Sequence, residues 1–550
     1  MLRNGSGKRG ILAAVLTVLA SVGLARAAGH SGVIRGVVRD SSGKPAAGAS
    51  VKARNIDKGI TFLVISQEQG LYRIGNLPPG RYTVQALGGG MQSDAKAKAP
   101  RKLGDAQTMT ADLRLTAWQD IASMTNSQYA AMMPEGEAKM LLLTRCTSCH
   151  GLENMVLERD DAEAWKLNIE VMRDRPFGFE PSAEITDQQR DELVEYLAKN
   201  WGPEVPSPNA ARDLPKTWLQ GDAAKYMAVE YEIPERAYIN DVAVDSQGIA
   251  WVSEQFKGNL GRLDPDTMTY TRIPLPPVRS GKFSRNAIAV DHQDRVWVMD
   301  GEPNDRLVQY DPKTGSFTTY AVPKSPDGDT RANTIRFHPN GNVWMTGMTA
   351  NRIMSFNPVT REFTPFPIPS GETAHPYGLA FDGKGDVWFT ENFGGRVAKL
   401  DLASGKITEY DVPTPDNLGS LAAHKGVGEV HSLRRMAADA EGNLWYGGQG
   451  LGKLGMIDYR TAKSSEYSPP TSNSGPFSID ADKKNNRIWF SEFLADQIAR
   501  FDPRAKTFVE YPLPTRHSRV RRIEVDQSRP NRVWFAGSGS DTVGYIEVLE

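Results

Sequence analysis

The sequence of 550 residues lacks the features that most directly mark a disulfide-rich, nucleic-acid-binding or membrane-embedded protein. Two cysteines are too few for a disulfide framework in a chain of this length. The 65 Lys and Arg residues nearly balance the 66 Asp and Glu residues, and the formal net charge of −1 gives no electrostatic reason to expect a nucleic acid or an anionic membrane as partner. Beyond the first thirty residues no apolar run approaches the ~20 residues that span a bilayer, so we expect no transmembrane anchor there.

What the sequence does contain indicates several domains built mainly from strands. A length of 550 residues corresponds to several domains at ~100–200 residues each. The 51 glycines and 35 prolines indicate many turns and many short strands, and they disfavour a helix bundle. We therefore predict a multidomain, mainly β protein.

The first 27 residues have the order of a secretory signal peptide. Basic residues precede an apolar run over residues 11–24, and a small-residue segment follows at residues 25–27. The alternative is a transmembrane anchor, but the apolar run is shorter than the ~20 residues that span a bilayer. We expect cleavage after residue 27 and a mature protein that is periplasmic or otherwise exported.

Residues 32–115 show alternating strand patterns separated by turn signals, which predicts a small β-sandwich. The segments at residues 48–51, 70–74 and 77–84 occur in the order found in carboxypeptidase regulatory-like domains, and the region resembles such domains over nearly its whole length. The resemblance implies an accessory module that positions its neighbours or binds weakly, without chemistry of its own.

Residues 120–205 are patterned as helices and contain the strongest chemical motif of the chain. Cys146, Cys149 and His150 form a C-x-x-C-H sequence, in which two thiolates can form thioethers with haem and the adjacent imidazole can bind its iron. A thioredoxin-type redox pair would need a βαβ context, and a zinc site would need further ligands that this region lacks. We therefore predict one covalent haem c per chain.

The helices around this motif resemble a small class I cytochrome c, and the resemblance implies a sixth ligand to the iron. Met172 lies on the same predicted helical face as Trp165 and Ile169, so it is the candidate for that ligand. Met155 is an alternative, and an open or water-ligated iron is another. His/Met ligation favours electron transfer, whereas a vacant position allows small-ligand chemistry.

Residues 226–550 form a sequence repeat of about 45 residues. Each repeat has an apolar strand, an Asp or His, a short polar turn and a strand that contains Trp: Trp251, Trp297, Trp344, Trp388, Trp445, Trp489 and Trp534. This period with four strands per unit predicts a β-propeller of seven blades. The last repeat stops before its fourth strand, and residues 228–234 match that strand, so we expect the two ends of the propeller to pair.

The propeller motif resembles the virginiamycin B (streptogramin) lyase family. That resemblance implies a Glu-x-His pair and a further Glu that together hold magnesium and place a histidine for proton abstraction. Glu429 and His431 match the pair, whereas Gly448 stands where the further acid is expected. Glu391 beside His375 on the neighbouring repeat could substitute, so His431 and His375 are candidate catalytic residues, and Glu429 and Glu391 are candidate magnesium ligands.

Propeller geometry predicts that these residues share one face with other polar groups. Residues just before the first strand and just after the second strand of each blade meet on the same rim. The rim residues predicted in this way are four acids and a set of bases and cations: Glu254, Asp300, Glu391, Glu492, His375, His431, Arg434, His517 and Arg521. A long insertion at residues 414–430 is expected over the same face.

Taken together, these patterns predict an exported c-type cytochrome fused to a propeller that binds a substrate or a partner. Its role would be electron transfer or that of a redox enzyme subunit, with a redox partner protein or a small molecule at the propeller face. The alternatives are a magnesium-dependent carbon–oxygen lyase of the virginiamycin B type and a non-catalytic interaction propeller. The domain order favours the redox interpretation, because an elimination reaction needs no electrons.

Overall fold

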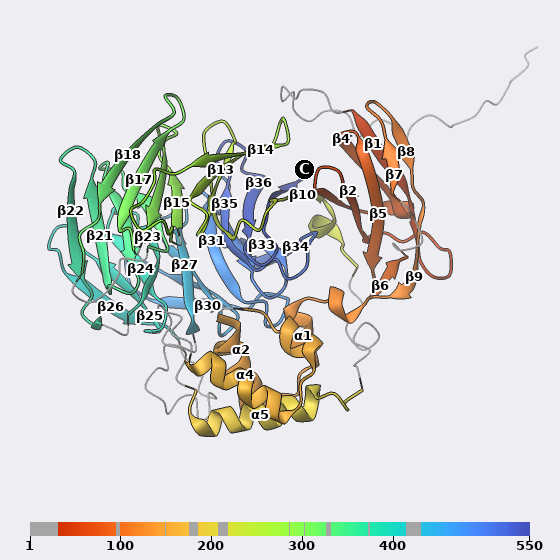
Figure 1. Cartoon of the computed structure of the whole chain (residues 1–550), viewed down its shortest axis with the longest axis horizontal. Coiled ribbons are helices and arrows are strands. Elements are labelled where there is room, and N and C mark those ends of the chain that lie inside the picture. Colours follow the sequence, from red (N-terminus) through yellow and green to blue (C-terminus); the bar gives the residue numbers. More distant parts are fainter. Residues whose placement is uncertain are drawn as a thin grey trace, which may run out of the picture.

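The computed structural model describes residues 31–94, 100–148, 150–174, 185–206, 218–284, 286–301, 303–325, 332–371, 374–413 and 431–549. The predicted signal peptide lies outside the described residues. Within them no helix is long and apolar enough to cross a membrane. The described chain is mainly β, with an N-terminal strand domain, a small helical region and a propeller (Figure 1).

The N-terminal domain packs strands around an apolar core that includes Ile34, Val51, Tyr72 and Leu77. In β4 the buried residues alternate with exposed ones, as expected for a strand with one face on a core. The strands of this domain are β1 (Gly32–Arg39), β2 (Ser50–Asn55), β3 (Ile60–Ile65), β4 (Leu71–Leu77), β5 (Gly80–Gly88), β6 (Met91–Ser93), β7 (Arg101–Leu103), β8 (Thr108–Thr110) and β9 (Leu113–Trp118). A short helical turn η1 (Glu68–Gly70) precedes β4.

The helical region has its own core, in which Leu141, Met155, Trp165 and Leu197 are buried. Thr125 and Thr186 each form a capping box that satisfies backbone groups at a helix start. The helices are α1 (Asn126–Met132), α2 (Glu137–Thr144), α3 (Glu153–Glu158), α4 (Ala162–Asp174) and α5 (Asp187–Trp201), with short turns η2 (Ile121–Ser123), η3 (Cys146–Ser148) and η4 (Gly221–Ala224).

Six blades of the propeller are separate four-stranded antiparallel sheets. They are β11 (Ile239–Val244) to β14 (Thr269–Pro274), β15 (Asn286–Val290) to β18 (Ser316–Ala321), β19 (Ile335–Phe337) to β22 (Glu362–Pro367), β23 (Pro376–Phe381) to β26 (Ile407–Asp411), β27 (Leu433–Ala438) to β30 (Ser464–Tyr467), and β31 (Pro476–Asp482) to β34 (Thr507–Pro512). Their inner strands between these limits are β12 (Ala250–Glu254), β13 (Asn259–Asp264), β16 (Val296–Asp300), β17 (Arg306–Asp311), β20 (Val343–Gly347), β21 (Arg352–Asn357), β24 (Val387–Glu391), β25 (Arg396–Leu400), β28 (Leu444–Gly448), β29 (Lys453–Ile457), β32 (Arg487–Glu492) and β33 (Gln497–Asp502).

The Asp and Trp of the repeat are linked by a hydrogen bond in four blades. The indole nitrogen of each Trp donates to the carboxylate of the Asp six residues earlier, at 2.8–2.9 Å, while the other carboxylate oxygen accepts backbone N–H groups of the intervening turn: Trp251 to Asp245, Trp297 to Asp291, Trp388 to Asp382 and Trp445 to Asp439. The repeat signature therefore encodes a turn that is held by one buried carboxylate.

The seven-bladed propeller was predicted, and six of its blades are separate sheets, whereas the seventh repeat does not form a sheet of its own. Its strands β35 (Val520–Val525), β36 (Arg532–Gly537) and β37 (Thr542–Val548) continue into β10 (Tyr226–Glu232), and β10 pairs on its other side with β3. The predicted pairing of the two propeller ends is confirmed, because β10 runs antiparallel to β37 from Tyr226 to Glu232. The resulting thirteen-stranded sheet joins the propeller to the N-terminal domain.

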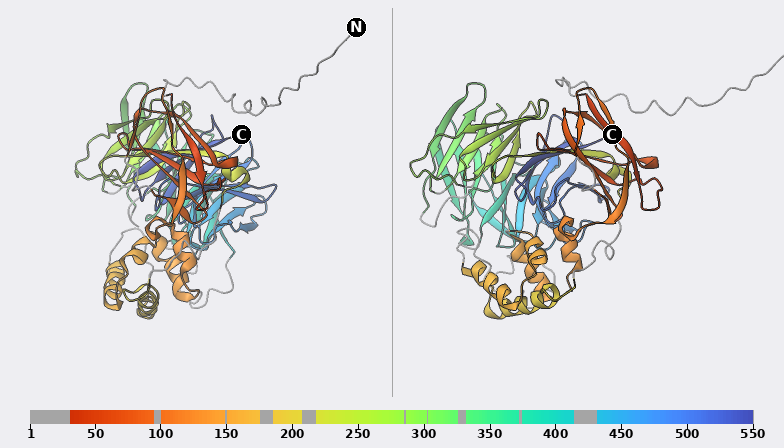
Figure 2. Two further views of the ribbon diagram at one scale, coloured as in Figure 1. Left: turned by 90° about the vertical axis from the view of Figure 1, so that its right-hand side faces the viewer. Right: turned by 45° about the vertical axis from the view of Figure 1, so that its right-hand side comes forward.

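The N-terminal domain and the helical region contact the propeller at two different places. The N-terminal strand domain stands beside the propeller where β10 pairs with β3, and the helices lie against one propeller face (Figures 1 and 2). The first strands of successive units are neighbours, and β11 contacts β35, so the ring of innermost strands is closed.

The junction at β10 buries a carboxyl group beside a lysine. Glu230 is 1 % exposed, and the Thr515 hydroxyl donates to one of its oxygens. Lys52 from β2 donates to the Pro514 carbonyl oxygen at 3.1 Å. Burial raises the pKa of Glu230 to about 7 and lowers the pKa of Lys52 to about 8.

We predict that Glu230 makes the junction less stable as the pH rises. Because its pKa is higher in the folded state, folding binds protons between pH 4.5 and about 7, and the free energy of unfolding falls across that range. Glu230→Gln should remove this fall and be more stable than wild type above pH 7, by on the order of 1–3 kcal/mol. Thermal unfolding at pH 5 and pH 8 measures the difference.

The exposed Glu68→Gln is the matched control and should show the pH dependence of the wild type. Equal pH dependence of the melting temperature in Glu230→Gln and wild type would contradict the assignment.

Candidate functional site

The helical region covers part of the propeller face on which the sequence placed the candidate binding residues. Four polar contacts hold it there. Gln449 Nε2 donates to the Thr147 carbonyl oxygen at 2.9 Å, and Ser127 N donates to the Leu494 carbonyl oxygen at 2.8 Å. His517 Nε2 lies 2.8 Å from the Met124 carbonyl oxygen, and Arg516 Nε donates to the Ser123 carbonyl oxygen at 3.2 Å.

Apolar contacts complete this interface in both directions. Leu451 of the propeller packs against the core of the helical region. Leu143 of α2 packs against a propeller cluster of buried side chains, which consists of Met348, Tyr377, Phe477, Phe493 and Leu494. The segment that carries the C-x-x-C-H motif is therefore seated on the middle of the propeller face rather than exposed at the end of a free domain.

The guanidinium of Arg434 lies next to the contact between Gln449 and Thr147. Arg434 is fully buried, and its Nε donates to Gln449 Oε1 at 2.6 Å. Its guanidinium carbon lies 5.2 Å from the ring centre of Tyr377 and 5.0 Å from that of Phe477. Gln449 thus links the buried cation to the backbone of Thr147 in the motif. The sequence placed Arg434 on this rim but offered no signal for Gln449, whose role depends on the docked helical region.

The motif residues that the structure describes are held in place by the helical core. Cys146 lies in η3, is half-buried and packs against the core cluster, and burial raises the pKa of its thiol to about 12. His150 Nδ1 lies 2.7 Å from the Gly151 carbonyl oxygen. Because a carbonyl oxygen only accepts, Nδ1 is the donor, and Nε2 is the nitrogen left for a metal. Cys149 lies outside the described residues.

The chain after the motif is fixed by Asn126. Its Oδ1 accepts from Leu152 N at 2.5 Å and from Glu153 N at 3.1 Å. In the same core the indole nitrogens of Trp165 and Trp201 are buried and have no hydrogen-bond partner in the described part of the chain. These two indole N–H groups lie in the core against which Cys146 also packs. Buried donors without partners are compatible with a further group that has acceptor atoms, such as haem.

The two methionines named as axial candidates lie on different helices. Met172 is half-buried near the end of α4, on the helix that also carries Trp165 and Ile169. Met155 is 3 % exposed on α3 and belongs to the core cluster that includes Cys146. The sixth ligand stays a prediction.

The four acids predicted at the rim each end the second strand of their blade, but they are buried there. All are 1 % exposed or less: Glu254, Asp300, Glu391 and Glu492. Glu254 accepts from the Tyr270 hydroxyl at 2.8 Å and Arg272 Nε at 2.7 Å, and Asp300 accepts from Arg306 Nε at 2.9 Å. These acids tie the end of the second strand of a blade to its third or fourth strand, because their side chains lie over the sheet toward those strands.

The candidate magnesium ligands are not assembled among the described residues. Burial, with Glu409 nearby, raises the pKa of Glu391 to about 8, and Arg396 lies 3.7 Å from its carboxylate. Glu429 lies outside the described residues. Within the described part of the chain no group of three or more His, Cys, Asp and Glu side chains could hold a metal ion.

The candidate histidines lie on adjacent blades, and backbone hydrogen bonds of Asn392 connect the two segments that carry them. Asn392 N donates to the His375 carbonyl oxygen at 3.1 Å, and Leu433 N donates to the Asn392 carbonyl oxygen at 3.1 Å, next to His431. The His375 ring lies 5.3 Å from the Phe393 ring. His431 is 2 % exposed, and burial lowers its pKa to about 4. His431 is therefore a neutral, enclosed imidazole at neutral pH.

These features define a β-propeller protein with a strand domain on its edge and a helical, C-x-x-C-H-bearing region on its face. The virginiamycin B lyase family matches residues 226–419 and 277–550, which is more than half of the chain. The chain belongs to this family. A carboxypeptidase regulatory-like domain matches residues 33–116, which confirms the N-terminal prediction. Neither match covers residues 117–225.

Solved structures of lyases share the propeller fold at low sequence identity. Virginiamycin B lyase from Staphylococcus aureus is 22% identical, with a TM-score of 0.50 over 59% of this chain and 100% of that chain. A streptogramin B lyase structure is 23% identical, with a TM-score of 0.50 over 60% of this chain and 100% of that chain. These likenesses establish the fold alone. No curated protein matches the chain.

We predict that Gln449→Glu loosens the helical region from the propeller. The carboxylate still accepts from Arg434, but it cannot donate to the Thr147 carbonyl oxygen and repels it. The loss should be about 1–3 kcal/mol. Amide hydrogen exchange in α2 should accelerate by about tenfold or more.

Gln255→Glu is the matched control, because Gln255 follows β12 as Gln449 follows β28, and its described contact is to Tyr238 in its own blade. Unchanged exchange in α2 of Gln449→Glu would show that the hydrogen bond to Thr147 does not hold the interface.

Proposed function

We propose that the protein is an exported c-type cytochrome whose haem, carried by residues 120–205, exchanges electrons with a molecule held at the propeller face. The main support for this proposal is that the C-x-x-C-H segment packs against that face of the propeller. Thr147, between the two motif cysteines, accepts a hydrogen bond from Gln449 of the propeller. A propeller that served only as a separate binding disc would not need this contact.

The residues that would hold haem c are Cys146 and Cys149 through thioethers, with His150 and Met172 as ligands of its iron. When bound, haem supplies one-electron chemistry at its iron. The donated hydrogen bond from His150 Nδ1 to Gly151 orients the imidazole and leaves Nε2 toward a metal. The unpartnered indole donors of Trp165 and Trp201 support a further group in this core.

Cationic and apolar propeller residues near the motif would influence the reduction potential of the haem. Arg434 and Arg521 stack over the rings of Phe477, Tyr377 and Phe493, at 5.0–5.5 Å from the ring centres. Cations close to the C-x-x-C-H segment disfavour a further positive charge there, so they would favour the reduced state of the haem. The apolar cluster under Leu143 keeps water away from the same side of the motif.

Export and partners follow from the same proposal. The signal-like residues 1–27 support a periplasmic or otherwise exported protein, where c-type haem is attached. The partner would be a redox protein or a small molecule at the part of the propeller face that the helical region leaves open.

A magnesium-dependent lyase activity is the second candidate, and membership of the virginiamycin B lyase family favours it. A catalytically inactive virginiamycin B lyase from Staphylococcus aureus has been solved with Quinupristin, with 21% identity to this chain. His431 and Glu429 would carry the reaction here. The enclosure of His431, the glycine at position 448 and the buried, Arg396-neighbouring Glu391 all weigh against it.

We expect one covalently bound haem per chain after periplasmic expression. Cys146→Ala should abolish stable covalent attachment at that position, whereas Met172→Ala should retain the haem but change its spectrum to high spin and lower its reduction potential. Met155→Ala is the matched comparison for the axial ligand. A colourless denatured chain with two free thiols would contradict the haem proposal, and an unchanged spectrum in Met172→Ala would assign the sixth ligand elsewhere.

A single assay separates the two candidate activities. Haem absorbance is followed while reductants and envelope extracts are added, with Quinupristin cleavage measured in parallel and with or without a chelator. The redox proposal predicts haem reduction that survives chelation. Lyase activity predicts magnesium-dependent cleavage that His431→Ala lowers by more than about 100-fold while the haem spectrum stays unchanged. That second outcome would replace the redox proposal.

A further inference from the structure

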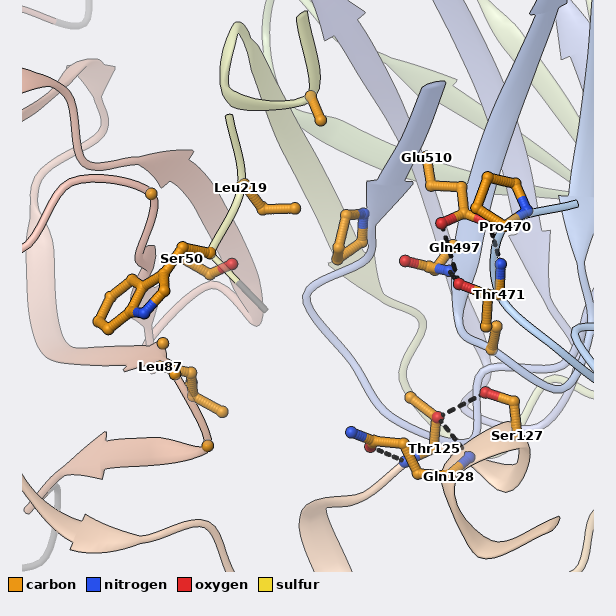
Figure 3. Close-up of a pocket in the computed structure, with 18 of the residues that line it drawn as sticks. Ser50, Leu87, Thr125, Ser127, Gln128, Leu219, Pro470, Thr471, Gln497 and Glu510 are labelled. Atoms are coloured by element: carbon orange, nitrogen blue, oxygen red, sulfur yellow. Dashed lines mark hydrogen bonds between the residues drawn. The ribbon is translucent and has the colours of Figure 1, made fainter. Parts of the chain in front are cut away.

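A cleft of about 690 Å³ lies where the three parts of the chain meet, away from the C-x-x-C-H segment (Figure 3). Ser50 and Leu87 line it from the N-terminal domain, Trp218 lines it from the chain that enters the propeller, and Gln128 lines it from α1. Gln497 and Glu510 line it from the sixth blade. Its volume falls in the range of small-molecule sites, which are common at domain interfaces.

Each charged side chain that lines this cleft already has a partner. Glu510 accepts from Thr471 N at 2.8 Å and from the Thr471 hydroxyl at 2.9 Å. Arg516 Nε donates to the Ser123 carbonyl oxygen at 3.2 Å, and Arg500 donates to Asp222 at 3.2 Å. Of these contacts only the one between Arg500 and Asp222 is an ion pair, while Glu510 and Arg516 are one acid and one base held by neutral groups. The wall therefore has no excess of one charge to offset the desolvation of a charged ligand.

The first residue of the third strand is neutral in the first, sixth and seventh blades, at Asn259, Gln497 and Thr542, and in the sixth blade it lines the cleft. The third strand begins with a cation in the second to fifth blades, namely Arg306, Arg352, Arg396 and Lys453. In the sixth blade this position is the neutral Gln497. Its amide NH₂ donates to the Thr471 hydroxyl at 3.1 Å and to Glu492 at 3.0 Å, which leaves its carbonyl oxygen as an acceptor. Figure 3 shows Gln497 and Ser50 on opposite sides of the cleft.

The indole ring of Trp218, in the wall of the cleft, packs against Gly88 and Gly89. A Cβ atom on Gly88 would lie 2.6 Å from Trp218 Cζ3, and one on Gly89 would lie 2.6 Å from Trp218 Cζ2. Gly89 also has a φ of +57°, which favours glycine. The indole therefore lies flat on backbone, and its position depends on the absence of side chains beneath it. Trp218 is half-buried and lines the cleft.

We propose that this cleft binds a short neutral oligosaccharide. The C–H faces of a sugar ring pack on an indole, and its hydroxyls pair with amide and hydroxyl groups such as those of Gln497, Ser50 and Gln128. Neutral hydroxyls match a wall whose acidic and basic side chains are balanced and already hydrogen-bonded. This site is separate from the haem motif and from the His431 face, so it adds a function to the proposed one: it would hold the protein on a glycan.

The test is isothermal titration calorimetry of the full-length protein with maltohexaose, cellohexaose and chitohexaose as probes. At least one neutral probe should bind the wild type. Gln497→Arg, which introduces the cation found in the fourth blade, and Trp218→Ala should each weaken that binding by about tenfold or more. Lys453→Gln, the same strand position outside the cleft, should bind as the wild type does.

Melting temperatures of all variants separate loss of binding from loss of folding, and Gln497→Arg serves if Trp218→Ala fails to fold. The proposal is overturned if none of the neutral probes binds at millimolar concentration, or if oligogalacturonate or a neutral hexapeptide binds more tightly than they do. It is also overturned if Gln497→Arg folds and binds the neutral probe with wild-type affinity. None of these outcomes depends on haem content or on lyase activity.

Discussion

The pairing of β10 on both of its edges is the constraint on which the rest of the architecture depends. A propeller whose last unit lacks its outer strand would expose a long unpaired edge, and β10 supplies that strand to β37. Its opposite edge is taken by β3, so the N-terminal domain is attached through a continuous ladder of backbone hydrogen bonds rather than through a flexible tether. The salt bridge from Arg54 to Glu232, at 2.7 Å, lies on the same seam. This attachment fixes one wall of the cleft relative to the sixth blade.

The helical region is held by a different kind of contact. Three of the four polar contacts described above between it and the propeller join a propeller side chain to a backbone carbonyl oxygen, as in Gln449 to Thr147 and Arg516 to Ser123. Such bonds position a surface without demanding a particular partner side chain, and Leu143 and Leu451 supply the apolar burial that accompanies them. The arrangement places the C-x-x-C-H segment against a face of the propeller. Family membership therefore describes the propeller, while the added regions change what its face can contact.

Much of the architecture could be predicted because its signals are local. In four of the repeats the Asp and the Trp six residues later form a hydrogen bond, so the sequence period and the blade coincide. The outer strand at residues 228–234 was recognisable because it matches a strand that the last repeat lacks. The four predicted rim acids do end the second strands of their blades, but they are buried there by contacts that no sequence period records, as where Glu254 meets Tyr270 and Arg272.

The sequence by itself determined the local chemistry of this protein: the C-x-x-C-H motif, the strand repeats and the turns that punctuate them. These depend on neighbours within a few residues, and their geometry is set before the chain is packed. Only the tertiary structure decided what the motif faces, that the seventh unit is shared with the N-terminal domain, and that Trp218 and Gln497 border one cleft. Those outcomes join residues hundreds of positions apart, and they follow from burial and hydrogen bonding between surfaces that no sequence period records.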